Sequence, residues 1–164
     1  MKILVISDTH IPERTQSLPR QLLDEVKSCD AVIHAGDFTA YSFYENLKSI
    51  SKQLHAVKGN MDDNRISNVL PSKSIISFHA TTVGIMHGIG PPQGLQELIR
   101  NSFKDDKIDV LIYGHSHTAV WERKDDIYML NPGSATDFII ARKRSYAVLT
   151  IEEESFGAEI KWVQ

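Results

Sequence analysis

The sequence predicts an α/β domain whose last third is mainly β. From residue 1 to about residue 117, short apolar runs rich in β-branched residues alternate with segments whose apolar residues recur at helical spacing. After residue 117, strand-like runs follow one another with only turn sequences between them. No linker, low-complexity tract or internal repeat divides the chain, so residues 1–164 are expected to form a single domain.

The first predicted strands are continuous apolar runs, which are typical of strands buried on both faces. They cover residues 2–7, 30–35 and 53–57. A hairpin is expected from 74–78 to 82–86, and another buried strand at 108–112. The last third contributes predicted strands at 119–122, 127–130, 146–151 and 158–163. Helices are predicted at 18–28, 40–50 and 95–103, while the Asn- and Asp-rich segment 60–64 is expected to form a turn.

The composition excludes several classes of protein. Hydrophobic residues make up 41% and charged residues 24% of the 164 residues, which is ordinary for a soluble domain with a substantial core. A net charge of -3 gives no electrostatic case for binding nucleic acid or a membrane. The single Cys29 excludes a disulfide framework and a cysteine-based zinc site. With no signal peptide or membrane-spanning run, we expect a cytoplasmic protein.

Two histidines, His115 and His117, stand where the predicted strand 108–112 ends and the chain turns at Gly114. In an extended segment, residues two apart point to the same side. Neutral imidazole is the commonest metal ligand in proteins, so this pair suggests a metal site. Two ligands do not close a site, however, and the alternative is a pair of solvated or locally hydrogen-bonded histidines.

Other predicted strand ends carry further groups of the same kind. Together they offer oxygen and imidazole-nitrogen ligands and no sulfur: Asp8, His10, Asp37, Asn60, His87, His115 and His117. Seven ligands are too many for one tetrahedral ion, and they suit two ions that share a bridging carboxylate. The mixed nitrogen and oxygen set favours a transition metal over calcium or magnesium. The remaining histidines, His34, His55 and His79, fall inside predicted strands and are expected to be structural.

Five short motifs occur in an order that resembles the calcineurin-like metallophosphoesterase superfamily. The compact length and the Gly-Asn-Met-Asp segment are similar to its small YfcE-like branch of microbial phosphodiesterases. The turn at residues 131–134 resembles another feature of that branch. The motifs are Asp8-x-His10, Gly36-Asp37, Gly59-Asn60, His87-Gly88 and Gly114-His115-Ser116-His117.

The resemblance implies a four-layer αββα sandwich of two mixed sheets flanked by helices. It also implies hydrolysis of a phosphodiester, or a phosphomonoester, in a small substrate by attack of a metal-bound hydroxide. Manganese is the first expectation for the two ions, with nickel, iron, zinc or cobalt as alternatives. The oligomeric state stays open, and a homo-oligomer, dimer or tetramer, would be compatible with the resemblance. Carried over by position, one ion would have Asp8, His10 and His117, the other Asn60, His87 and His115, and Asp37 would bridge them.

The chain departs from the family pattern at two positions. Protein-phosphatase-type members carry a histidine after the Asn to assist the leaving group, whereas this chain has Met61, and a thioether cannot donate a proton. Asp62 is therefore a candidate for an acid or orienting role. Some small members also have a histidine where this chain has Ile89, which changes the substrate pocket but not the metal ligands.

A second function on the same fold is a non-catalytic protein-binding scaffold. The phosphoesterase-like subunit of retromer resembles this fold, but has an impaired metal site and serves protein contacts. All seven ligand positions are intact in this chain, which favours a hydrolase over a scaffold.

Overall fold

The structure, a computed structural model, describes residues 1–164 and contains two five-stranded sheets. The first sheet has the order β10-β9-β1-β2-β3, formed by β1 (Lys2–Ile6), β2 (Ala31–His34), β3 (Leu54–Ala56), β9 (Ser145–Ile151) and β10 (Phe156–Trp162). The second has the order β4-β5-β6-β8-β7, formed by β4 (Lys73–Phe78), β5 (Thr81–Met86), β6 (Val110–Ile112), β7 (Val120–Lys124) and β8 (Ile127–Asn131).

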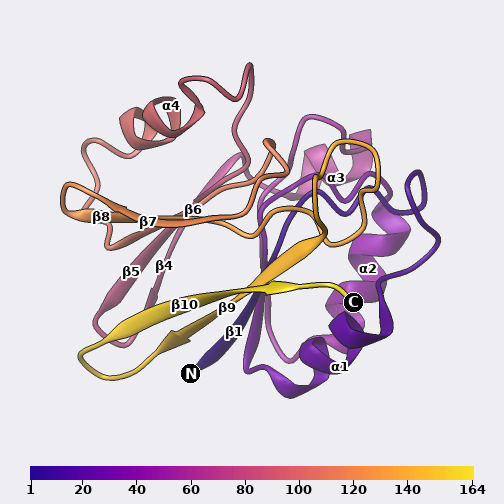
Figure 1. The fold of residues 1–164 in the computed structure, drawn as a ribbon, viewed down its shortest axis with the longest axis horizontal. Coiled ribbons are helices and arrows are strands. Elements are labelled where there is room, and N and C mark those ends of the chain that lie inside the picture. Colours follow the sequence, from indigo (N-terminus) through magenta and orange to yellow (C-terminus); the bar gives the residue numbers. More distant parts are fainter.

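Four helices flank the sheets: α1 (Arg20–Ser28), α2 (Tyr41–Ile50), α3 (Asn64–Val69) and α4 (Leu95–Ser102). Figure 1 shows α1, α2 and α3 together on one side of the molecule, with α4 alone on the other. Apolar side chains of α1 and α2 pack with the first sheet, and those of α4 pack with the second. The four-layer αββα arrangement implied by the resemblance is therefore confirmed.

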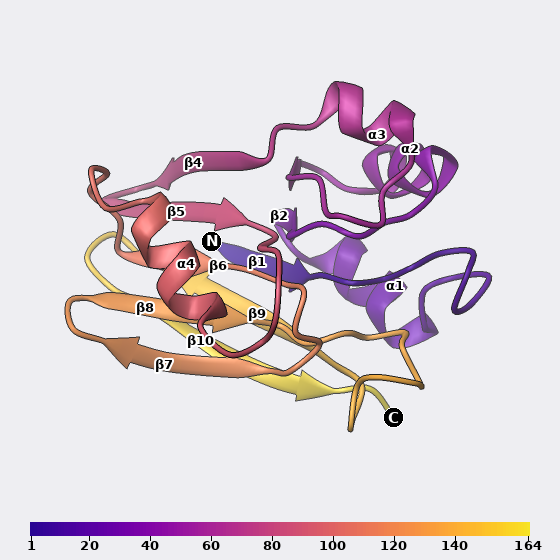
Figure 2. The ribbon, with the colours of Figure 1, turned by 90° about the horizontal axis from the view of Figure 1, so that it is seen from above.

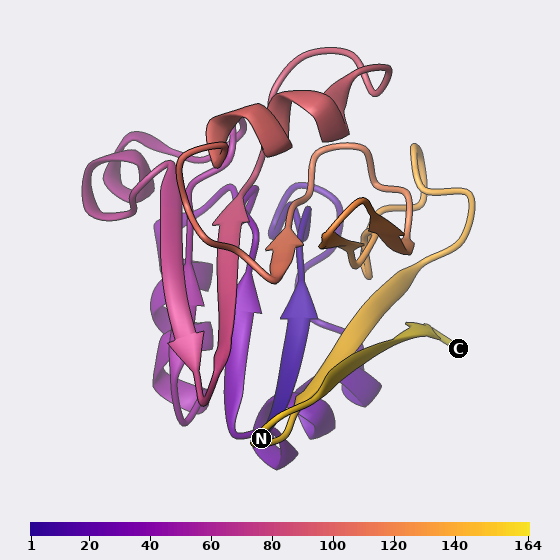
Figure 3. The same cartoon turned by 90° about the vertical axis from the view of Figure 1, so that its left-hand side faces the viewer.

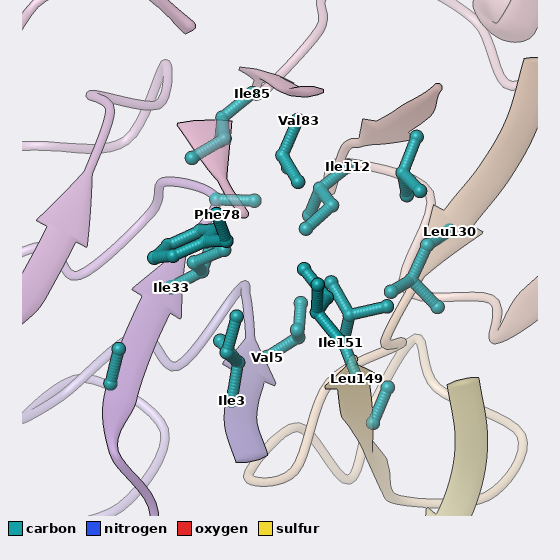
Figure 4. Packing of buried hydrophobic residues seen from close by; sticks show 14 of the residues in the cluster. Ile3, Val5, Ile33, Phe78, Val83, Ile85, Ile112, Leu130, Leu149 and Ile151 are labelled. Atoms are coloured by element: carbon teal, nitrogen blue, oxygen red, sulfur yellow. The ribbon is translucent and has the colours of Figure 1, made fainter. Parts of the chain in front are cut away.

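The side chains of β1 alternate between the two faces of the first sheet. Ile3 and Val5 belong to the core between the sheets, whereas Leu4 and Ile6 pack against the helices on the outer face. Successive strand side chains point to opposite faces, so a strand buried on both sides is apolar throughout. Figure 4 shows the core between the sheets, where Ile3 and Val5 meet side chains of the second sheet.

The directions of the strands determine which end of the sandwich is suited to a functional site. β1, β2 and β3 run parallel to one another, and so do β5, β6 and β8. In Figure 2 the arrows of β1 and β5 point the same way, and Figure 3 shows these strands rising together towards one end of the sandwich. The carboxyl ends of both sets of parallel strands therefore meet there, which is where open α/β sheets bind their ligands.

The predicted strands and helices are all present, with bounds that differ by a few residues. The predicted helix 18–28 begins only at Arg20, after Pro19. The sequence pattern predicts no helix near residue 64, whereas α3 starts there because the Asp63 side chain accepts a hydrogen bond from the Ile66 N–H and caps the helix. His79 was expected inside a strand but lies in the exposed turn between β4 and β5. None of the helices is long and apolar enough to cross a membrane.

From the size of the apolar core we can predict how the fold responds when metal is removed. Two apolar clusters of 15 buried residues each, one between the sheets and one under α1 and α2, exist without help from any ion. Chelation should therefore leave the far-ultraviolet circular dichroism spectrum unchanged. The free energy of unfolding should fall only by the binding contribution, about 2.7 kcal/mol at a metal concentration of 100 Kd. Collapse of the spectrum on chelation would contradict a core that stands alone.

Candidate metal centre

All seven predicted ligands follow the carboxyl ends of parallel strands. Asp8 and His10 follow β1, Asp37 follows β2, and Asn60 follows β3. From the second sheet, His87 follows β5, while His115 and His117 follow β6. Both sheets therefore contribute side chains to one end of the sandwich.

Five of these side chains form two overlapping groups with the geometry of a metal site. Asp8, His10 and His117 form one group, and Asp8, Asp37 and His87 form the other. Within each group, one potential ligand atom of every residue lies within 4.8 Å of the others. All five residues are buried, with exposed fractions between 0% and 6%.

Each of the two carboxylates lies between imidazoles assigned to different ions. Asp37 Oδ2 is 3.3 Å from His87 Nε2 and 3.8 Å from His10 Nε2. Asp8 Oδ1 is 3.2 Å from His117 Nε2 and 3.8 Å from His87 Nε2. The position of Asp37 fits the bridging role that the resemblance implies, and Asp8 is placed to serve the same purpose.

Asn60 and His115 stand at the outer edge of the centre. Asn60 Oδ1 lies 2.9 Å from His115 Nδ1, and His115 Nε2 lies 2.7 Å from the Gly90 carbonyl oxygen. Because both imidazole nitrogens already have partners, His115 must give up one of these contacts to bind a metal. A hollow of about 220 Å³ adjoins this edge, lined by Asn60 and His87 together with Lys58 and Ile89.

The backbone of the ligands is unusual. Five of the seven have positive φ: Asp8 at 53°, His10 at 44°, Asp37 at 58°, His115 at 69° and His117 at 53°. Asp and His tolerate this left-handed region better than most residues, yet each instance still costs on the order of 1 kcal/mol. The expectation that residues two apart share a side because the segment is extended is therefore wrong for these loops. Left-handed turns, not extended backbone, direct the side chains inward.

Two glycines allow the strand ends to approach one another closely. A Cβ atom on Gly114 would lie 2.0 Å from Ser7 Oγ and 2.8 Å from Asp8 Oδ2, so only glycine fits. A Cβ on Gly59 would lie 2.1 Å from Asp37 Oδ1. Close backbone approach therefore requires glycine at residue 114, and the same constraint explains the glycine before Asn60.

Metal ions fit this arrangement. His87 Nε2 is fully buried and makes no well-directed hydrogen bond, and its nearest charged groups are the Asp37 and Asp8 carboxylates at 3.3 and 3.8 Å. An ion among these atoms would give the nitrogen a partner. His10 Nε2 and His117 Nε2 face each other only 3.4 Å apart. Three imidazoles and two carboxylates form a donor set suited to divalent transition metals.

The charges of the side chains balance one another when no ion is present. Burial alone would raise the pKa of Asp8, but His87 and His117 outweigh it and lower that pKa to about 2. Burial would lower the pKa of His87, yet Asp8 and Asp37 raise it to about 9. The pKa of His117 is also raised, because Asp8 and Asp137 outweigh burial. Protons on the imidazoles thus neutralise the carboxylates, and a divalent ion would replace them.

Asp137 was missed by the sequence analysis. Its carboxylate is fully buried, and Oδ2 lies 2.6 Å from His117 Nδ1, the nitrogen that faces away from the centre. Oδ1 accepts hydrogen bonds from the N–H groups of Ile139 and Ile140. A carboxylate behind a metal-binding histidine fixes its tautomer and orientation. The local sequence gives no signal for this contact, because the partners are 20 positions apart with two strands, β7 and β8, between them.

The turn at residues 131–134 holds the two ligand loops together. Asn131 Nδ2 donates to the Gly114 carbonyl at 2.8 Å, and Ser134 Oγ donates to the Asp8 carbonyl at 2.7 Å. Both residues are fully buried. Gly133 has φ of 72°, the left-handed value that the third residue of a type II turn requires.

Asp62, the candidate acid, has a clear structural task. Its Oδ1 accepts from the Thr39 N–H at 2.8 Å and its Oδ2 from the Gly59 N–H at 2.7 Å. Burial raises the pKa of this carboxyl above its usual range, against the two hydrogen bonds that lower it. Oδ1 thus ties the Asn60 loop to the Asp37 loop and Oδ2 closes the Asn60 loop on itself, so the acid role stays a prediction.

His34, His55 and His79 lie outside the metal centre. His34 is fully buried and stacked on Phe38; its Nδ1 accepts from the Gly36 N–H, so the proton belongs on Nε2, beside Thr9 Oγ1. His55 packs edge-on against Phe78, and His79 is exposed.

The four-layer fold, with this cluster at its strand ends, agrees with the family that the motifs resemble. Residues 1–154 match the calcineurin-like phosphoesterase superfamily domain, and the chain belongs to that family. A probable metallophosphoesterase of Methanocaldococcus jannaschii is 41% identical over 137 residues, which are 83% of this chain and 69% of that protein. Another, from Methanothermobacter thermautotrophicus, is 34% identical over residues that make up 98% of this chain and 91% of that protein.

The similarity extends to proteins with another name. Vacuolar protein sorting-associated protein 29 of Schizosaccharomyces pombe is 34% identical over 83% of this chain and 73% of its own. The crystal structure of its Entamoeba histolytica counterpart with zinc superposes with a TM-score of 0.80 at 26% identity, covering 99% of this chain and 98% of that one. A Thermotoga maritima protein gives a TM-score of 0.78 at 33% identity, covering 99% of both chains.

The raised pKa values predict that metal binding releases protons. At pH 7 His87, with a pKa of about 9 in the metal-free chain, carries a proton that a metal must displace. Metal affinity should therefore rise about tenfold per pH unit for each proton displaced, and level off above about pH 9. Calorimetry in buffers of different ionisation enthalpy measures the release. Equal heats in all buffers would show that His87 is neutral before metal binds.

The position of Asp137 predicts a loss of metal affinity without loss of fold. Asp137→Asn keeps the shape but removes the charge behind His117, so metal affinity should fall about 10- to 100-fold. Equilibrium dialysis against manganese and zinc measures this directly. Asp105→Asn is the matched control, because Asp105 is exposed and forms no side-chain hydrogen bond. An unchanged affinity in Asp137→Asn would remove Asp137 from the metal centre.

Proposed function

We propose that this protein is a hydrolase that cleaves phosphodiester bonds, or phosphomonoester bonds, in small substrates with two divalent metal ions. Manganese is our first choice of metal, as the sequence analysis expects. The observation that carries the proposal is the convergence of five buried ligands, in which the fully buried His87 Nε2 faces both the Asp37 and the Asp8 carboxylate. Keeping two carboxylates buried beside each other is costly unless cations compensate them.

The side chains have distinct tasks in this proposal. When bound, the two ions supply Lewis acidity to the phosphoryl group and lower the pKa of water. Asp8 and Asp37 provide the negative charge that holds the cations, and the imidazoles complete the two sites. Lys58 lines the adjoining hollow, with its Nζ 3.1 Å from the Ser67 carbonyl oxygen, and its charge favours an anionic substrate there.

Two exposed apolar side chains stand at the outer edge of the metal centre, next to residues that line the hollow or bind His115. Met61 and Ile89 expose 51% and 60% of their surface beside Asn60 and Gly90, and neither can donate a proton. This edge therefore contacts the ester group of a substrate by apolar packing. We propose that leaving-group protonation depends on water.

A protein-binding scaffold remains the second candidate, favoured by the similarity to vacuolar protein sorting-associated protein 29. The zinc complex of the Entamoeba histolytica protein shows that metal binding alone does not separate the two functions. Turnover does separate them. A scaffold would bind metal without hydrolysing bis(p-nitrophenyl) phosphate, whereas a hydrolase would lose turnover on chelation and regain it with manganese.

The first test of the proposal is Asp37→Ala. Removing a carboxylate that lies between two imidazoles should lower metal content towards zero and turnover by about a thousandfold or more, since metals supply several kcal/mol. Elemental analysis and rate assays on the same preparations measure both. The control is His79→Ala, in an exposed turn, which should leave turnover nearly unchanged at saturating metal. An active Asp37→Ala protein with two metals would refute the assignment.

The second test concerns Met61. Without an acid beside the leaving group, activated aryl esters should be cleaved much faster than alkyl esters, with a steep dependence on leaving-group pKa. Met61→His should flatten that dependence, because a general acid contributes about 10²–10⁴-fold and most for poor leaving groups. Met61 is half-exposed, so the substitution should fold. Hydrolysis rates of a series of phosphate esters, plotted against leaving-group pKa, are compared for the two proteins. A shallow slope in the unmodified protein would point to Asp62 as the proton donor.

A further inference from the structure

A second hollow, of about 300 Å³, lies between the loop before α1 and the loop that follows the turn at residues 131–134. None of its lining residues is one of the seven predicted ligands. Arg20 and Arg144 supply its charge, while Leu18 and Phe138 supply apolar surface. Its size is at the lower end of small-molecule pockets.

The charge of this hollow has no counterpart within the chain. No carboxylate lines it, and neither arginine forms an ion pair, whereas Arg100 and Arg123 elsewhere in the chain each pair with an aspartate. The whole chain has a net charge of -3, so two unpaired guanidinium groups around one hollow are not a general excess of positive charge. Arginine is the side chain best matched to the oxygens of phosphate.

The surrounding side chains suit a ligand that has both a charged group and an apolar or planar group. The Arg144 guanidinium lies over the Phe138 ring, 4.4 Å from its centre, which fixes its direction. The Ser17 hydroxyl has no partner within the chain and is a further donor. Phe138 is 67% exposed, so its ring remains open to a planar or apolar group.

We propose that this hollow binds the phosphate group of a small organic phosphate, with the guanidinium groups of Arg20 and Arg144 on the phosphate oxygens. Leu18 and Phe138 would contact the organic part. Helix α1 begins at Arg20 and has no acidic residue in its first turn, so its positive end adds to the potential without defining the site.

The wall of the hollow is also a support of the metal centre. Thr136 lines the hollow, and its hydroxyl donates to the Thr9 carbonyl at 2.7 Å, between Asp8 and His10. The next residue, Asp137, contacts His117. A phosphate held here would be either a second phosphate of the substrate or a separate effector, and the chemistry of recognition is the same.

Binding is tested on the metal-free protein, so that the result does not depend on the proposed hydrolase activity. Phenyl phosphate and inorganic phosphate are titrated into ¹⁵N-labelled protein after chelation, with phenol as the uncharged control. Saturable shifts of the amides of Arg20 and Phe138 are expected, and Arg144→Gln should weaken binding at least tenfold. Arg123→Gln, an exposed arginine that pairs with Asp126, should change nothing. The absence of saturable shifts, shifts confined to His87 and His115, or undiminished binding by Arg144→Gln would overturn the site.

Two kinetic measurements on the metal-loaded protein identify the source of the phosphate. If it is part of the substrate, Arg144→Gln should raise KM for esters that carry a second phosphate but not for bis(p-nitrophenyl) phosphate. If it is an effector, added phenyl phosphate should change the turnover of bis(p-nitrophenyl) phosphate in a saturable way, and Arg144→Gln should abolish that change. If neither effect is observed, the proposed link between this hollow and the metal centre is wrong.

Discussion

The structure depends on keeping two carboxylates, Asp8 and Asp37, almost without solvent at the end of the sandwich where the sheets meet. Each has an exposed fraction of 2% or less, and buried charges of like sign are stable only beside compensating positive charge. That requirement explains the three imidazoles around them. It also explains why the ligand loops adopt left-handed backbone and why a glycine stands where the loop after β6 touches Asp8. Strain is tolerated here because the surrounding contacts leave no alternative.

The sequence was sufficient for the strands and for placing the seven candidate ligands at strand ends, for a physical reason. Apolar runs reveal buried strands, and parallel strands place whatever follows them at one edge of the sheet. A polar residue directly after such a run, such as Asp8 or Asp37, is therefore visible without coordinates. Periodicity alone did not reveal the second sheet or the assignment of the ligands to two ions. The family resemblance supplied both.

What the sequence did not reveal depends on contacts between distant segments. Asp137 acts on His117 only because the turn at residues 131–134 brings its loop beneath the metal centre. The left-handed φ of His10 follows from its partners in the neighbouring loop: its N–H donates to the Asp37 carbonyl. Helix α3 escaped notice because it is only six residues long, and its cap, Asp63, lies in a segment that favours turns.

The division of the ligands between the two sheets has a mechanical consequence. His10 and His117 are 107 positions apart in the chain, yet their ring nitrogens are 3.4 Å apart. An ion held between such residues would act as a reversible cross-link that closes a very long loop, in the way that a disulfide does. The sheets could then separate at that end only after the ion has left, so metal dissociation would set the pace of unfolding. The opposite end of the sandwich, where the chain begins, has no such cross-link and should be the first to open (Figure 1).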